Sequence, residues 1–442
     1  VTSVSNAGTV DITGGTLSLT GSGTSTGTVT IASGSTLQLS GGSGTQTMSG
    51  SVSGAGTVAG IGGTVVLTGS LNVTGTATSA GTLTVSGPVA ALGAVTITNG
   101  TLTVSAPVAS AGSITLSGGT ANFNTNMTPT SLNQSAGTLG GTGNLTVSGA
   151  GTWSGGTMTG SGTTRVQGGL TLSGAGNLFL GGGRVLEHAG TGGWTGSGTL
   201  YSTASGLGTL RLVSGTFTVG DAGLQDTGSQ GGMLALEIQA GATLRKSLGG
   251  TTSFSTVVTS VSNAGTVDIT GGTLSIGSSG YQQTSGLTSL AGGSLTVAGT
   301  LTLSGGSLTG TGTVTATTVL NTGGHVGPGL SPGTLTITGN YTQGASGTLN
   351  IEIGGTTVGT QYDRLAISGT ATLDGTLVAT VINGFTPTLG NSFQFMSFGS
   401  RSGDFITKTI APQLKTDAPG ATAYTLSVRV AYLVTNTADS GA

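Results

Sequence analysis

The sequence predicts an all-β protein, a single-stranded, right-handed parallel β-helix (β-solenoid) with roughly 19 residues per coil. Phrases such as Gly-Thr-Leu-Thr-Val alternate polar and apolar residues and stop at Gly, Ser or Asn, which is typical of short half-buried strands. The phrases also return at that one interval: Gly93–Ile97 and Gly100–Val104 are followed by Gly112–Leu116 and Gly119–Phe123. Such a step suits one solenoid coil of two or three strands, and it is too short for a helical repeat or a propeller blade.

Within each coil the alternation assigns the two sides of the strand. Leu83 and Val85 are expected to point into the coil, and Thr82 and Thr84 to point outward. The 90 Gly residues, against 8 Pro in 442 residues, predict many corners and few residues that break a strand ladder. Composition alone would also allow a flexible Gly-rich linker, but the regular spacing of Leu, Val and Ile argues against disorder.

Changes in composition and in the regularity of the repeats predict four segments of the chain. These are a regular β-helix at 1–163, an irregular and more charged section at 164–257, a second regular section at 258–330, and a divergent C-terminal β segment or cap at 331–442. The third segment begins with a copy of the start of the chain, because 1–19 and 258–276 are identical at 18 of 19 positions. We therefore expect the chain to be one section of a longer object, with further coils before residue 1.

Charge is scarce. The net charge is −2 from ten Lys and Arg and twelve Asp and Glu residues, and the 153 residues between Asp11 and Arg165 contain none of these and no His. Acid–base catalysis cannot be built from Ser and Thr alone, so no enzyme site is expected there. The chain has no Cys, no basic stripe for nucleic acid and no apolar run of about 18 residues that would cross a membrane. We expect no catalytic, cofactor-binding or metal-binding residues and no cofactor.

The irregular section contains nine of the 22 charged residues, together with His188. They are Arg165, Arg184, Glu187, His188, Arg211, Asp221, Asp226, Glu237, Arg245 and Lys246. Arg184, Glu187 and His188 could form an acid–base cluster, although polar residues on a solvated loop are the simpler interpretation. An alternative function is therefore a carbohydrate-active β-helix enzyme with its site in 165–246. It would require carboxylates from adjacent coils to meet about 5 to 10 Å apart.

Other polar residues have simple structural interpretations. His325 is expected in a turn, and Asp11 and Asp268, which occupy equivalent positions in the two copies, are expected at strand edges or turns. Asp is too scarce for a calcium-binding β-roll, and no Lys-Ser/Thr follows the glycine cluster at 181–183 to make a phosphate loop.

The outward threonines suggest a second alternative function. Thr82 and Thr84 precede Thr101 and Thr103 by one coil step, so they could form a regular grid of hydroxyls and methyls. Such a grid resembles those of ice-binding β-helices, which implies a threonine array that binds ice or another crystal surface. Threonine is also simply a favoured outward residue on strands, where stacked charges would repel one another.

The C-terminal segment resembles the closing segment of autotransporter-type passenger domains, or haemagglutinin-type β-helical surface proteins of bacteria. The resemblance rests on the runs Ser331–Ile337, Gly339–Gln343, Gly347–Glu352, Tyr362–Leu365 and Gly369–Leu377. The upstream coils, including Trp153–Met158, are similar to the repeats of large bacterial surface proteins. An autotransporter would continue into an outer-membrane barrel, whereas this sequence stops at Asp439–Ala442, so we expect a removed barrel or another export route.

The resemblance implies a function without catalysis. We expect an extracellular or cell-surface bacterial protein that acts as an adhesin, a stalk or a fibre. The expected partners are neighbouring copies joined end to end, and the surfaces or glycans of a host or neighbouring cell.

Overall fold

The computed structural model describes residues 3–203, 206–221, 234–254, 258–277 and 280–429. Within these ranges the chain forms 48 strands and no helix, and the strands stack in parallel as a β-solenoid, which confirms the predicted fold class. None of the described residues forms a helix long and apolar enough to cross a lipid bilayer. The chain divides into two compact units, described separately here. Unit 1 is Val1–Val267 with Thr273–Ser279, and unit 2 is Asp268–Gly272 with Gly280–Ala442.

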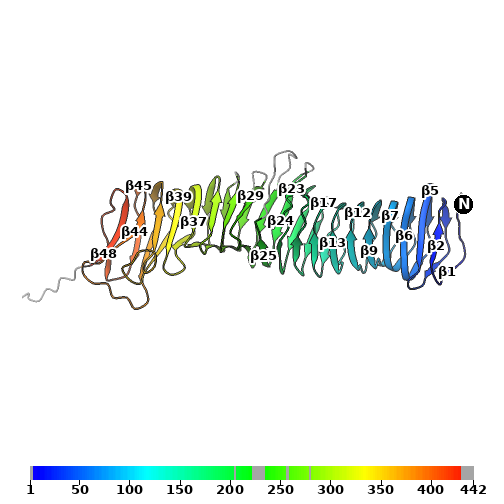
Figure 1. The fold of residues 1–442 in the computed structure, drawn as a ribbon, viewed down its shortest axis with the longest axis horizontal. Helices are drawn as coiled ribbons and strands as arrows, with labels where there is room; N and C mark the ends of the chain where they lie inside the picture. Colours follow the sequence, from blue (N-terminus) through cyan, green and yellow to red (C-terminus); the bar gives the residue numbers. More distant parts are fainter. Residues whose placement is uncertain (1–2, 204–205, 222–233, 255–257, 278–279, 430–442) are drawn as a thin grey trace, which may run out of the picture. The chain divides into compact units, whose positions relative to one another are not determined.

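The coils of unit 1 stack side by side (Figure 1). Their strands fall on three faces, and most coils contribute one strand to each face, whereas the coils at Val108 and Met127 have only isolated bridges on the first face. The strands of the first face are β1 (Val10–Ile12), β4 (Val29–Ile31), β8 (Val89–Ala91), β15 (Leu145–Val147), β18 (Thr163–Val166), β21 (Val185–His188), β24 (Gly208–Leu212), β26 (Leu234–Ile238) and β29 (Val258–Asn263).

The strands of the second face are β2 (Thr16–Leu19), β9 (Ala94–Ile97), β11 (Ser113–Leu116), β13 (Ser131–Gln134), β16 (Gly151–Trp153), β19 (Leu170–Leu172), β22 (Thr191–Trp194), β25 (Gly215–Val219), β27 (Ala242–Lys246) and β30 (Thr266–Ile269).

The strands of the third face are β3 (Gly23–Ser25), β10 (Thr101–Val104), β12 (Thr120–Phe123), β14 (Thr138–Gly140), β17 (Gly156–Met158), β20 (Leu178–Leu180), β23 (Leu200–Ser202), β28 (Thr251–Phe254) and β31 (Thr273–Ile276). Three long strands continue from one face to the next: β5 (Thr36–Met48), β6 (Val52–Leu67) and β7 (Leu71–Val85).

Inward residues repeat from coil to coil as the alternation predicts. Leu83 pairs with Leu102 and Val85 with Val104, and all four side chains have no exposed surface. The outward Thr84 and Thr103 between them are only half-buried. A continuous aliphatic interior therefore runs along unit 1, and its burial is the main source of stability.

The length of a coil is not constant. In the regular section Ser105 and Asn124, which are hydrogen-bonded from one coil to the next, are 19 residues apart. In the charged section the separation grows to 24 residues between Glu187 and Arg211, and to 26 residues between Arg211 and Glu237. The predicted step is thus confirmed between β6 and β17, although Val29 and Val52 nearer the start are 23 residues apart. In the charged section the corners lengthen while the inward positions stay in phase.

Corners depend on glycine where successive coils touch. Gly93 has a φ of +62°, and a Cβ there would lie 1.9 Å from the carbonyl carbon of Thr74 one coil earlier. No other residue fits this position. Buried glutamines close other corners from inside: the side-chain amide of Gln134 donates to the carbonyls of Gly137 and Thr157 at 3.2 and 3.0 Å.

Unit 2 has the same three-faced plan. Its first face has β32 (Tyr281–Gln283), β35 (Thr300–Leu303), β42 (Thr370–Leu373) and β45 (Ser400–Gly403). The second has β33 (Leu287–Leu290), β36 (Ser307–Gly310), β38 (His325–Pro328), β40 (Thr348–Ile353), β43 (Thr376–Val381) and β46 (Thr407–Ile410). The third has β34 (Ser294–Val297), β41 (Arg364–Ile367) and β44 (Ser392–Ser397), while β37 (Thr313–Asn321) and β39 (Thr334–Gln343) turn from the third face into the first.

The end of unit 2 departs from this pattern, as predicted for the C-terminal segment. Its coils lengthen to 30 residues between the register partners Thr370 and Ser400, and to 31 between Leu365 and Met396. The antiparallel strand β48 (Ala423–Val428) then pairs with β44 and with β47 (Leu414–Thr416). Aromatic rings fill this end, where Phe395 and Tyr424 lie 5.1 Å apart between ring centres and are both fully buried. The switch to antiparallel pairing fits a terminal cap.

The two units relate only loosely to the four predicted segments. The division by compactness falls at residues 268–280, near the start of the copied stretch. The boundaries predicted at 164 and 331 coincide instead with increases in coil length, where Thr163 pairs with Val185 and Thr334 with Arg364. As domain boundaries they stay predictions.

Candidate functional site

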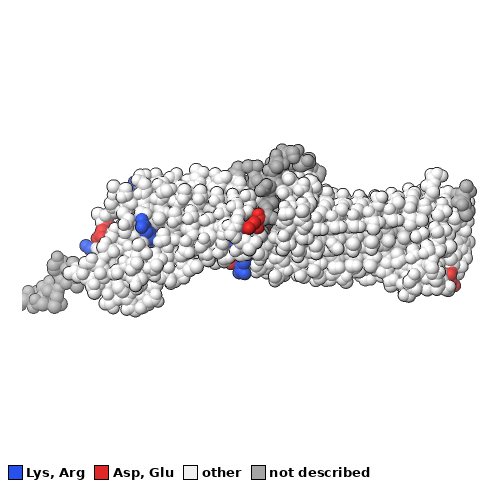
Figure 2. Space-filling model, viewed as in Figure 1, with Lys and Arg blue, Asp and Glu red and all other residues white. Residues whose placement is uncertain are grey.

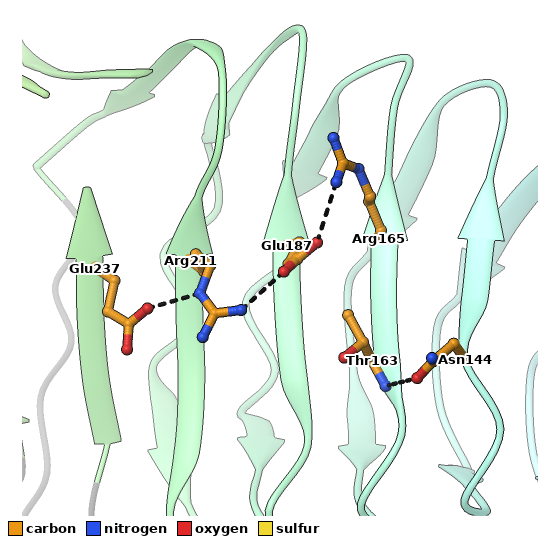
Figure 3. A network of polar contacts seen from close by, with 6 residues as sticks. All are labelled: Asn144, Thr163, Arg165, Glu187, Arg211 and Glu237. Carbon is orange, nitrogen blue, oxygen red and sulfur yellow. Dashed lines mark hydrogen bonds and ion pairs between the residues drawn. The ribbon is translucent and has the colours of Figure 1, made fainter. Parts of the chain in front are cut away.

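Four charged residues of the irregular section stack in one line on the first face of unit 1 (Figure 3). Arg165, Glu187, Arg211 and Glu237 lie on β18, β21, β24 and β26 and are direct partners in the strand register. We call this set the ion-pair ladder. Its side chains point outward because the inward positions of these strands are occupied by residues such as Leu186 and Leu210.

The ladder alternates in sign, so every neighbour is an opposite charge. A guanidinium nitrogen of Arg165 lies 3.7 Å from Glu187, Arg211 donates to Glu187 at 2.9 Å, and its Nε donates to Glu237 at 2.6 Å. The hydrogen bond to Glu237 is the largest of the effects that raise the pKa of Arg211. Each carboxylate is therefore engaged by an arginine and serves to join coils.

Arg184 does not lie on a solvated loop, and that interpretation of the sequence is wrong. Its side chain has no exposed surface. It donates to the carbonyls of Thr159 and Gly141 at 2.5 and 2.9 Å, and to the hydroxyl of Thr164 at 2.8 Å. Burial lowers the pKa of Arg184 to about 10. The guanidinium fork connects successive coils from inside.

His188 is also fully buried, in contrast to the solvated-loop interpretation. Its Nδ1 accepts a hydrogen bond from the backbone N–H of Leu170 at 3.2 Å, which places the proton of the neutral ring on Nε2. The ring meets Phe217 edge to face at 5.1 Å between centres, and burial lowers the pKa of His188. Glu187, the next residue in the chain, points to the other side of the strand, so the two residues form no acid–base pair.

A third charged group lies on the second face of unit 1. Lys246 has no exposed surface and donates to Asp221 at 2.6 Å and to the carbonyl of Leu248 at 2.8 Å. The hydrogen bond from Lys246 lowers the pKa of Asp221. A hollow of about 570 Å³ beside this pair is lined by Trp194, Asp221 and Leu248 among others. The one carboxylate that lines this hollow, that of Asp221, is already hydrogen-bonded to the ammonium group of Lys246.

A carbohydrate-active enzyme would require two carboxylates from adjacent coils to lie about 5 to 10 Å apart. Glu187 and Glu237 are two coils apart on one face with Arg211 between them, and Asp221 is paired on another face. Asp226 lies outside the described residues. No group of three or more His, Asp or Glu side chains that could hold a metal ion occurs among the residues that the structure describes.

The predicted threonine grid forms in part. One line on the third face consists of threonines in seven successive coils, which we call the threonine ladder. Its members are Thr45, Thr64, Thr82, Thr101, Thr120, Thr138 and Thr157. The parallel line through Thr84 and Thr103 is interrupted by Val66 on one side and Asn122 on the other. A two-column grid therefore spans few coils.

All outward residues of the regular section other than Asp11 are uncharged. In Figure 2 the visible face carries no charged residue between the acidic group at the N-terminal end and the charges of the irregular section. Asp11 accepts a hydrogen bond from the Thr30 hydroxyl one coil later, and the equivalent Asp268 is half-buried on β30. His325 begins strand β38, so its expected place in a turn is wrong.

Sequence reasoning missed an acidic site in unit 2. Asp363, which immediately precedes β41, is only 2% exposed, and its two oxygens accept hydrogen bonds from the backbone N–H groups of Gly333 and Glu352, both at 2.8 Å. Burial raises the pKa of Asp363 to about 7, with a smaller contribution from the charge of Glu352. Only the fold brings these residues together, since the loop at Gly333 lies 30 residues earlier in the chain.

Comparison with known proteins adds no assignment. No family model matches the chain, and no curated protein matches its sequence.

Proposed function

We propose that this chain is a non-enzymatic structural and adhesive protein of the bacterial cell surface, forming a stalk or fibre. The observation that carries the proposal is the in-register stacking of identical outward residues, of which the threonine ladder is the longest run. Such stacking presents the same chemical group at a spacing of about 4.8 Å and stiffens the chain through continuous backbone pairing.

The charged section supports the same proposal. Arg165, Glu187, Arg211 and Glu237 are used to join coils. Arg184 and Lys246 are likewise fully buried and bonded to neighbouring coils. Charges placed in this way strengthen a scaffold. The resemblance of 331–377 to the closing segments of passenger domains supports a location outside the cell.

Surface location can be tested on intact cells that produce the full-length protein. Protease shaving followed by mass spectrometry should release peptides from the threonine ladder section, and antibodies against the chain should label the outside of the cell in electron micrographs. Peptides that appear only after lysis would contradict the proposal. A cytoplasmic protein of the same cells is the control.

Self-association of copies is part of the proposal, because the ends of a parallel solenoid are templates for pairing. Sedimentation of the purified chain over a hundredfold concentration range should show growing assemblies. A molecular mass that stays that of the monomer would contradict self-association and would not affect the proposed location at the cell surface.

A further inference from the structure

A small hollow lies on the second face of unit 2, where one outward side chain is missing. Gly327 on β38 lies between Thr309 on β36 and Asn350 on β40, and together they border a space of about 300 Å³. A Cβ at Gly327 would meet only the methyl group of Thr309, at 3.7 Å, and the backbone there is not left-handed. Neither the backbone conformation nor the packing requires glycine at this position, so the space itself is the feature to explain.

The hollow is bordered by two polar side chains of the same strand. Asn350 and Glu352 point outward from β40, two residues and thus about 6.6 Å apart. Among the described residues, neither side chain takes part in a hydrogen bond, although the carboxylate of Glu352 acts on nearby Asp363 through its charge. The Asn350 amide, which can both donate and accept hydrogen bonds, therefore lies beside the Glu352 carboxylate, which only accepts and carries a full negative charge.

The opposite wall is a loop held in a fixed position. The buried carboxyl of Asp363 bonds to the N–H of Gly333 at the end of the loop and to the N–H of Glu352 in the strand, both at 2.8 Å. Leu330, in the same loop, is 58% exposed and lines the hollow together with Pro328. The hollow is therefore built before any ligand arrives, which lowers the cost of binding.

We propose that this hollow binds one sugar ring of a neutral glycan. Neighbouring hydroxyls of a sugar donate and accept hydrogen bonds, and Asn350 can accept and donate in turn while Glu352 can accept. The C–H face of the sugar ring can lie against Leu330. The volume is at the lower end of the range of about 300 to 1,000 Å³ for small-molecule sites, which suits a single ring. The proposal rests on the adhesive part of the proposed function and gives it a location.

The test uses the full chain and a panel of methyl glycosides of neutral hexoses and pentoses, followed by saturation-transfer NMR and titration. At least one glycoside should bind the wild-type protein. Gly327→Val, which fills the hollow, should weaken its affinity about tenfold or more, and Asn350→Ala and Glu352→Gln should each weaken it by a similar factor through one lost hydrogen bond.

Matched controls come from elsewhere in the chain. Asn133→Ala removes an exposed outward amide in unit 1, and Gly249→Val adds a side chain at another glycine with open space around it. Both should leave the affinity unchanged. Circular dichroism and urea midpoints equal to wild type would show that the site variants are folded.

Two results would overturn the proposal: no glycoside binds at millimolar concentration, or binding is unaffected by Gly327→Val. Binding of methylammonium in preference to the sugars, with loss of affinity in high salt, would also overturn it and identify a cation site instead. None of these results affects the surface-labelling test, so the two proposals can fail separately.

Discussion

The regular and the charged sections of unit 1 solve the same stacking problem in different ways. In the regular section, coils such as those of β10 and β12 have equal length, and identical outward residues such as Thr101 and Thr120 lie side by side. In the charged section the coils lengthen, and opposite charges such as Glu187 and Arg211 take the place of identical neutral residues. The comparison indicates that stacking of identical residues fixes the strand register where successive coils have equal length. Where coil lengths differ, pairs of opposite charge support the register.

The largest effect is expected at Arg184, which connects coils from inside. Arg184→Ala leaves buried acceptors at Gly141, Thr159 and Thr164 without their donor and should lower the free energy of unfolding by about 4 kcal/mol. Urea unfolding followed by tryptophan fluorescence measures it, because both tryptophans, Trp153 and Trp194, lie in unit 1.

Arg165→Ala is the control for this change. The Arg165 side chain is 40% exposed at the end of the ion-pair ladder and should cost only about 0.5 kcal/mol. Equal effects of the two substitutions would contradict the structural role given to Arg184.

Reversing the central charge of the ladder should have the next largest effect. Arg211→Glu places three carboxylates in successive coils, at Glu187, position 211 and Glu237, and should cost about 2 kcal/mol. Thr152→Glu, an outward change in the uncharged section, should cost less than about 0.5 kcal/mol. High salt should narrow the difference between the two variants, and a difference that does not change with salt would argue against a charge effect.

The two units should respond to pH in opposite directions. His188 is held neutral because burial lowers its pKa, so the unfolded chain, with a His pKa of about 6.5, binds the proton first as the pH falls. Unit 1 should therefore lose stability below about pH 6.5. His188→Gln should reduce this loss, measured as tryptophan-monitored urea midpoints at pH 7.5 and 5.

Asp363 in unit 2 has the reverse effect. Its pKa rises from 3.8 in the unfolded chain to about 7 in the fold, so the folded state keeps the proton longer. Its contribution to stability should fall as the pH rises from about 4 to 7 and stay low above that range. Pulse proteolysis of unit 2 should show this trend, and Asp363→Asn should flatten it. A wild-type profile that rises with pH over this window and does so equally in the variant would refute the assignment.

The smallest effect is predicted for a substitution that extends the ion-pair ladder by one coil. Thr146 is the register partner of Arg165, so Thr146→Glu adds an ion pair at the end of the ladder. The change should stabilise unit 1 by about 0.3 kcal/mol, whereas the same substitution at Thr152 should not. A double-mutant cycle with Arg165→Ala isolates the pair, and a coupling energy of zero would show that the register alone does not create the interaction.

The sequence was sufficient to predict the solenoid, because its recurring step of roughly 19 residues and the alternation at residues such as Leu102 and Val104 report directly on stacking and burial. The alternation from Leu186 would also have placed His188 inside. The ion-pair ladder could not be predicted, because matching Arg165, Glu187 and Arg211 requires coils that are unequal and longer than those of the regular section. The site of Asp363 depends on a loop 30 residues away, which no local pattern reveals.

Coil lengthening also shows where foreign sequence can be added. The corner between β16 and β17 has two residues, Ser154 and Gly155, whereas the next corner on that edge, between β19 and β20, has the five residues 173–177. The flanking Leu172 and Leu178 remain buried, and the residues 174–177 are exposed. The solenoid thus accommodates three more residues at this corner than at the previous one, and an epitope or fluorophore tag placed after Ala175 should leave the buried residues on either side in place.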